Sequence, residues 1–262
     1  MTNANQLLVI DIGNTNLTIG LYKKDELLWH WRLATDHKKM QDEYGLQLLG
    51  LLQHAGVQKN QLKGIAISSV VPQLTGKVRS ASLQYLGIEP VIVDSGIKTG
   101  IRILYDDPKA VGADRICDAV AVKKLYGGPA CVIDFGTATT FNAINADGEY
   151  LGGAITAGVN LAAEALYTYA AKLPKIDIQQ PPSVIGRNTV YAMQSGLLFG
   201  YVSMVEGMVE RFKKELGTDT KVIATGGLAE LISQQTDVIT HFSPWLTLDG
   251  LRMIWEMNQL KA

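Results

Sequence analysis

Short runs of hydrophobic and β-branched residues alternate along this chain with longer segments of helical periodicity. The runs predict strands at residues 7–12, 18–22, 27–33, 64–69, 90–93, 101–105, 131–135, 140–144 and 221–224. The periodic segments predict helices at residues 42–54, 73–85, 112–125, 158–171 and 189–216. This alternation indicates an α/β protein with a mixed or parallel sheet.

One hydrophobic pattern occurs twice. Residues 8–15, LVIDIGNT, are echoed by residues 131–139, CVIDFGTAT. In each copy an apolar strand ends in an aspartate, Asp11 or Asp134, before a turn that contains glycine and threonine, and a second strand follows. Each half is therefore expected to open with a β-hairpin. The offset of about 120 residues is the size of a small domain, so we expect two related domains, at residues 1–117 and 118–262.

The composition limits the classes of function. Hydrophobic residues make up 47% of the chain and charged residues 19%, and the net charge is −1, which is typical of a folded protein. The balance of 24 Lys and Arg against 25 Asp and Glu offers no basic surface for a nucleic acid. We therefore expect small-molecule ligands and no nucleic-acid partner.

Cysteine usage and hydropathy point to a cytoplasmic protein. Cys117 and Cys131 lie in apolar runs and are expected to be buried, and the four scattered histidines do not predict a zinc site. The N-terminus lacks a basic segment, and no apolar run approaches the roughly 18 to 20 residues of a membrane helix. No membrane partner is expected.

The two turns have the chemistry of phosphate sites. A strand that ends in Asp, followed by Gly-Asn-Thr-Asn, offers backbone N–H groups with hydroxyl and amide donors. The sequence contains neither a P-loop nor a dinucleotide fingerprint, and neither turn contains lysine. The phosphate charge would therefore need Mg²⁺ held through carboxylates such as Asp11 and Asp134. A single such string could equally be an ordinary hairpin turn.

A third glycine-containing segment follows later. Residues 222–228, VIATGGL, predict a strand that runs into a Gly-Gly turn at the start of a short helix, where a sugar or base could lie against the backbone. In order, the three segments resemble those of the actin-like ATPase superfamily, which includes acetate and sugar kinases and in which two ribonuclease H-like domains close over ATP. The resemblance implies an α/β fold with two ribonuclease H-like domains, each a mixed sheet flanked by helices.

The segment between the two turns narrows the resemblance. Residues 107–115, DPKAVGADR, stand after DIGNTN and before DFGTATT and ATGG, an order similar to that of type III pantothenate kinases over nearly the whole chain. Asn142 departs from this pattern, since many relatives carry an acid there. The resemblance implies ATP-dependent phosphorylation of the 4′-hydroxyl of pantothenate, the first step of coenzyme A biosynthesis. It also implies Mg²⁺ and a monovalent cation, K⁺ or NH₄⁺, as cofactors.

Two adjacent residues fit this chemistry. Asp114 could accept the hydroxyl proton as the catalytic residue, and an ordinary pKa near 4 would suffice because phosphoryl transfer has a loose transition state. Arg115 offers a planar fork for the carboxylate of pantothenate. The pair could instead be an acid at a helix start with a solvated neighbour.

The resemblance assigns further residues to each ligand. The substrate pocket would contain Tyr105, Gly112, Ala113, Asp114, Arg115 and Thr189. The ATP site would contain Asp11, Ile12, Gly13, Asn14, Thr15, Asn16, Leu17, Thr18, Thr137, Gly226 and Gly227. Asp134 would bind the monovalent cation, and Asp11 would hold Mg²⁺ indirectly. Tyr105 could instead be core packing, and Thr189 could simply cap a helix.

The long helix predicted at residues 189–216 carries more apolar surface than one helix stripe normally buries. Gly196 and Gly200 lie four residues apart and would let a second backbone approach, from a partner chain or from a neighbouring helix of the same chain. The resembled family is dimeric, so we expect a homodimer in which Thr189 reaches the partner's pocket.

Two other functions fit parts of the pattern. A sugar kinase of the same superfamily would share the phosphate turns, but Arg115 beside Asp114 favours an acidic substrate. A non-catalytic nucleotide-dependent regulator is the second alternative, and the net charge of −1 disfavours a DNA-associated one.

Overall fold

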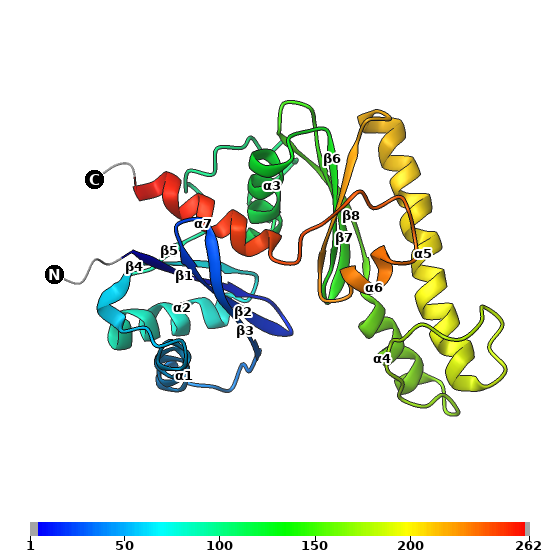
Figure 1. Ribbon diagram of the computed structural model, residues 1–262, viewed down its shortest axis with the longest axis horizontal. Coiled ribbons are helices and arrows are strands. Elements are labelled where there is room, and N and C mark those ends of the chain that lie inside the picture. Colours follow the sequence, from blue (N-terminus) through cyan, green and yellow to red (C-terminus); the bar gives the residue numbers. More distant parts are fainter. Residues whose placement is uncertain (1–4, 260–262) are drawn as a thin grey trace. The chain divides into compact units, whose positions relative to one another are not determined.

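The computed structural model describes residues 5–259 (Figure 1). The chain divides into two compact units. Unit 1 contains the residues up to Gly100, Asp107–Ala121 and the residues from Leu246 onward. Unit 2 contains Ile101–Asp106 and Val122–Trp245.

Unit 1 is built on a five-stranded mixed sheet of order β3-β2-β1-β4-β5. Its strands are β1 (Gln6–Ile12), β2 (Asn16–Lys23), β3 (Glu26–Ala34), β4 (Leu62–Ser69) and β5 (Val91–Ile92). The first three strands form an antiparallel meander, while β4 pairs in parallel with β1 and β5 in parallel with β4. The central strand β1 is hydrophobic at almost every position because both of its faces are covered.

Helices cover both faces of this sheet (Figure 1). They are α1 (Gln41–His54), α2 (Pro72–Ala81), which continues as a π-helical turn (Ser82–Leu86), and α7 (Leu246–Gln259), with a 3₁₀ turn at Lys59–Gln61. Side chains of α1 and α2 share a buried cluster with Leu8, Ile10 and Ile12 of β1. On the opposite face α7 contacts β1, β2 and β4.

Unit 2 has a second five-stranded mixed sheet, of order β10-β9-β6-β7-β8. Its strands are β6 (Ala130–Phe135), β7 (Ala138–Ile144), β8 (Tyr150–Ala157), β9 (Lys221–Gly226) and β10 (His241–Phe242). The pairing repeats that of unit 1, since β6, β7 and β8 are antiparallel and β9 runs parallel to β6. The helices α4 (Val159–Tyr169), α5 (Thr189–Leu216) and α6 (Ala229–Ser233) pack against this sheet and one another. A 3₁₀ turn (Pro108–Ala110) precedes α3 (Ala113–Leu125).

The two mixed sheets confirm the predicted fold class, and the antiparallel pairs β1–β2 and β6–β7 confirm the two hairpins. Burial of Cys117 and Cys131 is also confirmed, and burial raises the pKa of the Cys131 thiol to about 12. The strand predicted at 101–105 is wrong: in this segment only Ile103 forms a bridge, to Tyr150. Both β8 and β10 were absent from the predicted strands.

The packing of α7 differs from the expected domain division at residue 117. This helix belongs to unit 1, although its residues lie within 118–262. Gly64 of β4 leaves room for Trp255, because a Cβ atom at Gly64 would collide with the indole ring. The Tyr22 hydroxyl donates a hydrogen bond to Asp249 at 2.8 Å. The division between the units also falls inside α3, after Ala121.

Candidate active site

The two aspartates of the repeated motif occupy the same place in the two sheets. Asp11 is the penultimate residue of β1 and stands between Thr18 of β2 and Ser68 of β4. Asp134 is the penultimate residue of β6 and stands between Thr140 and Thr225. Each carboxylate is therefore flanked by hydroxyl residues on both neighbouring strands.

The first turn joins β1 to β2 and is exposed at residues 14–16. The Gly13 N–H donates to the Asn16 carbonyl at 3.0 Å and closes the turn. A Cβ atom at Gly13 would lie 3.1 Å from that carbonyl oxygen, so glycine lets the turn close without displacing the carbonyl. Two of the predicted ATP-site residues in this segment, Ile12 and Leu17, flank the turn. Their side chains are buried in the core of unit 1.

The second turn is one residue shorter. The Gly136 N–H donates to the Ala138 carbonyl at 3.1 Å, and Thr137 is exposed. Gly158, which precedes α4, donates its N–H to the Thr137 carbonyl at 3.0 Å. Because a Cβ atom at Gly158 would collide with this carbonyl, the glycine lets α4 begin directly against the turn. Gly158 has no local sequence signal that predicts this contact.

The predicted Thr-Gly-Gly segment approaches Asp134. Gly226 ends β9 with φ +94°, and a Cβ atom there would collide with Oδ1 of Asp134. Glycine is thus required at position 226 both by its backbone conformation and by the nearby carboxylate. Gly227 follows as an exposed turn residue before α6, as the sequence predicted.

Asp114 lies in the first turn of α3 in unit 1 and is only partly exposed. Its Oδ1 accepts the Arg115 N–H at 2.7 Å. Gly112 packs beside it, since a Cβ atom at Gly112 would collide with Oδ1 of Asp114 and lie 3.3 Å from Cγ1 of Val70. The Val70 N–H donates to the Ile12 carbonyl at 3.0 Å, which connects this group to the end of β1.

The electrostatics of Asp114 differ from the expectation of an ordinary pKa. Burial raises the pKa of Asp114, against the opposing effects of the Arg115 N–H and guanidinium. Burial raises the pKa of the Cys117 thiol as well, and the charges of Asp11, Asp118 and Asp114 raise it further. Asp11 and Asp114 therefore both lie near enough to Cys117 for their charges to raise the pKa of its thiol. The structure brings these two predicted residues into one region of unit 1.

Tyr105 lies in the segment Ile101–Asp106, which is attached to β8 by backbone hydrogen bonds. The Leu104 N–H donates to the Tyr150 carbonyl at 2.7 Å, and the Tyr150 N–H donates to the Arg102 carbonyl at 2.9 Å. Tyr105 is 38% exposed, and its ring centroid lies 6.4 Å from that of Tyr150. Tyr105 is therefore not a fully buried core residue, which was the alternative for this position.

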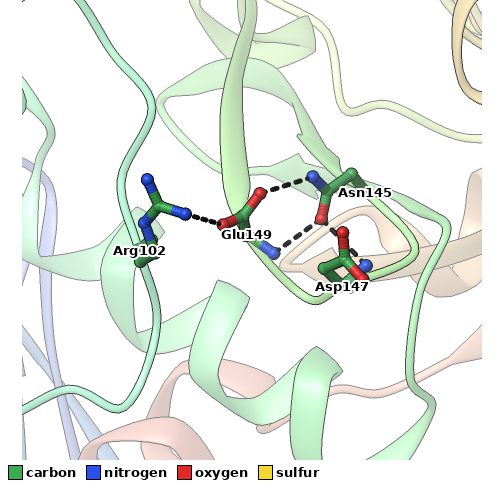
Figure 2. Close-up of polar contacts among 4 residues, drawn as sticks. All are labelled: Arg102, Asn145, Asp147 and Glu149. Atoms are coloured by element: carbon green, nitrogen blue, oxygen red, sulfur yellow. Dashed lines mark hydrogen bonds and ion pairs between the residues drawn. The ribbon is translucent and has the colours of Figure 1, made fainter.

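A polar cluster fixes the same segment at the turn before β8. Figure 2 shows Arg102 donating to Glu149, at 2.8 Å. The second oxygen of Glu149 accepts Nδ2 of Asn145 at 2.8 Å, and Oδ1 of Asn145 accepts the N–H groups of Asp147 and Glu149. The cluster therefore ties the chain near Tyr105 to the β7–β8 turn.

Asn142, the departure from the family pattern, is fully buried in β7. Its Oδ1 accepts the Tyr150 hydroxyl at 3.0 Å, and its Nδ2 donates to Oγ1 of Thr140 at 3.0 Å. Thr140 stands opposite Asp134 in the β6–β7 register. The amide thus links Tyr150 to the strand position beside Asp134 through neutral hydrogen bonds.

Thr189 begins α5 and is exposed. The side chain of Asn188 caps the helix by accepting the Tyr191 N–H at 2.9 Å. The cap is therefore Asn188, and Thr189 is not needed for that role.

The described residues contain neither a metal-ligand cluster nor a helix that could span a membrane. Residues 5–259 contain no group of three or more His, Cys, Asp and Glu side chains placed to hold a metal ion. No helix in the same range combines the length and apolar character that a membrane crossing demands.

Solved structures share this fold at low sequence identity. A Campylobacter jejuni protein assigned to the Baf family of transcriptional activators is 18% identical, with 97% of this chain and 99% of that chain covered and a TM-score of 0.61. A Sinorhizobium meliloti protein assigned as a 2-dehydro-3-deoxygalactonokinase is 12% identical, with 96% and 99% covered and a TM-score of 0.58. Acetate kinase of Porphyromonas gingivalis is 12% identical, with 96% and 100% covered and a TM-score of 0.54. These likenesses show that the chain shares the fold of these three proteins.

The family model of type III pantothenate kinase matches residues 7–211. The match contains both predicted phosphate turns, the segment with Asp114 and Arg115, and Thr189. It covers well over half of the sequence, so the chain belongs to the type III pantothenate kinase family.

Proposed function

We propose that Asp114 is the catalytic base in the phosphorylation of pantothenate by ATP, which is the reaction of this family and the first step of coenzyme A biosynthesis. The observation that carries the proposal is the position of Asp114 at the start of α3. Gly112 packs against its carboxylate and against Val70, and Val70 is hydrogen-bonded to Ile12, the neighbour of Asp11 at the end of β1. A raised pKa makes this carboxylate a better proton acceptor than an exposed aspartate.

The reaction then runs as a direct transfer. The 4′-hydroxyl oxygen of pantothenate forms a bond to the γ-phosphorus while the bond from that phosphorus to the β,γ-bridging oxygen breaks, which releases ADP. The hydroxyl proton moves to Asp114 and later to solvent. Asp114 also orients the hydroxyl, since its own carboxylate is held by the Arg115 N–H and by the close packing of Gly112.

The substrate carboxylate supplies a second point of recognition. Arg115 follows Asp114 directly, and its guanidinium can bind that carboxylate through two parallel hydrogen bonds. The remaining pocket residues in this proposal are Tyr105, Gly112, Ala113 and Thr189. Tyr105 suits this role because part of its ring is exposed while β8 holds its backbone segment.

Each unit contributes a segment for ATP binding in this proposal. Residues 11–18 bind phosphates through backbone N–H groups and short polar side chains, and Thr137, Gly226 and Gly227 contact the nucleotide. The family uses ATP with Mg²⁺, which neutralises phosphate charge when bound. Asp11 fits Mg²⁺ as an oxygen donor flanked by Thr18 and Ser68. With no larger ligand cluster among residues 5–259, we propose that Asp11 holds the ion indirectly, through water.

Asp134 is the proposed site of a monovalent cation, K⁺ or NH₄⁺. It stands beside a phosphate turn that contains no lysine, and the backbone of Gly226 lies against its carboxylate. A cation there would supply positive charge that the turn lacks.

We further propose a cytoplasmic homodimer that uses α5. Most of the apolar residues of α5 from Leu197 to Phe212 pack within unit 2, so that part of the helix offers no excess apolar surface to a partner. Gly196 and Gly200 support a partner more directly, because no described neighbour lies within 4 Å of a Cβ atom built at either position. Apolar side chains near the start of α5 and on the adjoining α4 are also exposed: Leu161, Leu166, Tyr167, Tyr169, Val190 and Tyr191.

A coupled ADP-release assay tests the substrate. The purified protein with ATP, Mg²⁺ and K⁺ is expected to release ADP with pantothenate and not with N-acetylglucosamine or without an acceptor. Turnover of the sugar alone would support the sugar kinase alternative. A folded protein that binds ATP and turns over neither compound would support a non-catalytic regulator.

A further inference from the structure

Thr35 follows β3 directly and contacts the first phosphate turn through two hydrogen bonds. Its Oγ1 donates to the Gly13 carbonyl at 2.6 Å. Its backbone N–H donates to the Thr15 carbonyl at 2.9 Å. Thr35 lies twenty positions after Thr15 in the sequence, and the β2–β3 pairing brings them together.

Thr35 therefore donates to the carbonyl groups of the first and third residues of the turn, Gly13 and Thr15. The third carbonyl engaged there, that of Asn16, accepts the Gly13 N–H. A carbonyl oxygen carries negative partial charge and repels phosphate, whereas a backbone N–H attracts it. Engaging the carbonyls of Gly13, Thr15 and Asn16 within the protein therefore fixes the orientation of the peptide groups that would face phosphate.

The segment that carries Thr35 is itself anchored to two helices. The Tyr44 hydroxyl of α1 donates to the Asp36 carbonyl at 2.8 Å. Nζ of Lys77, in α2, donates to the carbonyls of His37 and Lys39 at 3.0 and 2.8 Å. The segment after β3 is therefore fixed to α1 and α2, and Thr35 connects it to the exposed turn at residues 13–16.

We propose that Thr35 is a positioning residue for ATP, which holds the turn at residues 13–16 in the conformation that binds phosphate. The inference rests on the proposed function, in which residues 11–18 hold the ATP phosphates. Loss of the Thr35 hydroxyl would leave the buried contacts of unit 1 in place and would weaken phosphate binding, because the turn would spend less time in the binding conformation.

The test compares two threonines with the same local chemistry. Thr35→Val removes the hydroxyl with little change in shape, and Thr35→Ser retains it. Thr220→Val is the matched control, because Oγ1 of Thr220, just before β9 in unit 2, donates to the Gly217 carbonyl at the same distance, 2.6 Å. Titration calorimetry with ADP and Mg²⁺ measures binding without turnover, and thermal unfolding measures stability.

Thr35→Val is expected to raise the Kd for ADP and the KM for ATP about three- to tenfold, the usual effect of one hydrogen bond, and to leave the KM for pantothenate unchanged. Thr35→Ser is expected to restore the wild-type values. Thr220→Val is expected to lower the Tm at least as much as Thr35→Val without changing the Kd for ADP.

Two further variants separate this inference from the proposed ATP site. If Asp11→Asn and Asn14→Ala weaken ADP binding and Thr35→Val does not, the role of Thr35 is overturned while the ATP site stands. If all three leave the Kd unchanged, the proposed ATP site is wrong. An equal loss of ADP affinity in Thr220→Val would show that Thr35 acts only through general stability.

Discussion

The backbone of Gly112 packs against the Asp114 carboxylate so closely that a side chain at position 112 would displace it. Any Cβ atom there would collide with Oδ1 of Asp114 and lie 3.3 Å from Cγ1 of Val70. Because Val70 is hydrogen-bonded to the end of β1, the carboxylate rather than the strand would have to move.

Gly112→Ala is therefore expected to lower kcat about 10²-fold, the cost of a catalytic group misplaced by about 1 Å. The matched control is Gly76→Ala in α2, where no described neighbour lies within 4 Å of the added Cβ atom. That control is expected to stabilise the fold by about 0.4–1 kcal/mol without changing kcat. Steady-state kinetics and thermal unfolding of both variants check this. Wild-type turnover in Gly112→Ala would mean that the Asp114 position tolerates displacement.

Asp114→Asn is expected to lower kcat by roughly 10² to 10⁴-fold and to leave ADP affinity nearly unchanged, because a positioned base contributes to the transition state and not to nucleotide binding. Single-turnover measurements with saturating ATP separate the chemical step from product release. Unchanged turnover would remove Asp114 from the role of base.

The same variant is expected to be more stable than the wild type at neutral pH. Burial raises the pKa of Asp114 in the folded state, so the folded protein binds the proton more tightly than the unfolded chain does. Stability therefore falls as pH rises from the ordinary aspartate pKa, near 4, through the raised pKa of the folded state. Urea unfolding of both proteins from pH 4 to pH 8 measures this. The advantage of Asp114→Asn should grow from pH 4 until the pH passes the raised pKa and then stay constant, and a difference that is the same at every pH would contradict the raised pKa.

Local sequence signals were sufficient for the aspartates and turns and insufficient for the contacts around them. Asp11 and Asp134 were predicted correctly as strand ends because a buried run followed by Asp and Gly is a local pattern. β8 was missed since Gly152 and Gly153 lower its strand propensity, and only pairing with β7 makes it a strand. Thr35 could not be predicted as a contact of Gly13, because their proximity depends on the β2–β3 pairing.

The position of α7 in unit 1 also could not be predicted from local sequence signals. The second face of the unit 1 sheet needs a cover, and α7 supplies it from the far end of the chain through Leu248 and Trp255. The sequence repeat placed these residues in the second domain because a repeat records order along the chain and not packing. Asn142, by contrast, was noted in the sequence, but only the structure gives its partners, Tyr150 and Thr140.

Activity is expected to require K⁺ or NH₄⁺, because the turn beside Asp134 contains no lysine to offset phosphate charge. Asp134→Asn should lower turnover in K⁺ to the level that the wild type shows in Na⁺, and it should remove the response to added K⁺. Asp147→Asn, an exposed carboxylate of the same unit, is the control and should keep that response. Full wild-type activity in Na⁺ alone would contradict the cation site.

The proposed homodimer is tested by adding bulk at two glycines with equally open surroundings. Gly200 of α5 and Gly50 of α1 both lie inside helices, and neither has a described neighbour within 4 Å of an added Cβ atom. Gly200→Leu should shift the protein from dimer to monomer in light scattering, because the larger side chain would keep a partner backbone away. Gly50→Leu should leave the dimer intact. A Gly200→Leu protein that stays dimeric would move the interface away from this part of α5.

Mixing two inactive chains tests whether Thr189 serves the partner's site. One chain carries Asp114→Asn and the other Thr189→Arg. In a mixed dimer, one site would combine the intact Asp114 of the second chain with the intact Thr189 of the first, and the other site would contain both changes. Random exchange gives half mixed dimers, so activity should return to about a quarter of the wild-type value. If exchange is demonstrated and no activity returns, Thr189 contributes to the site of its own chain.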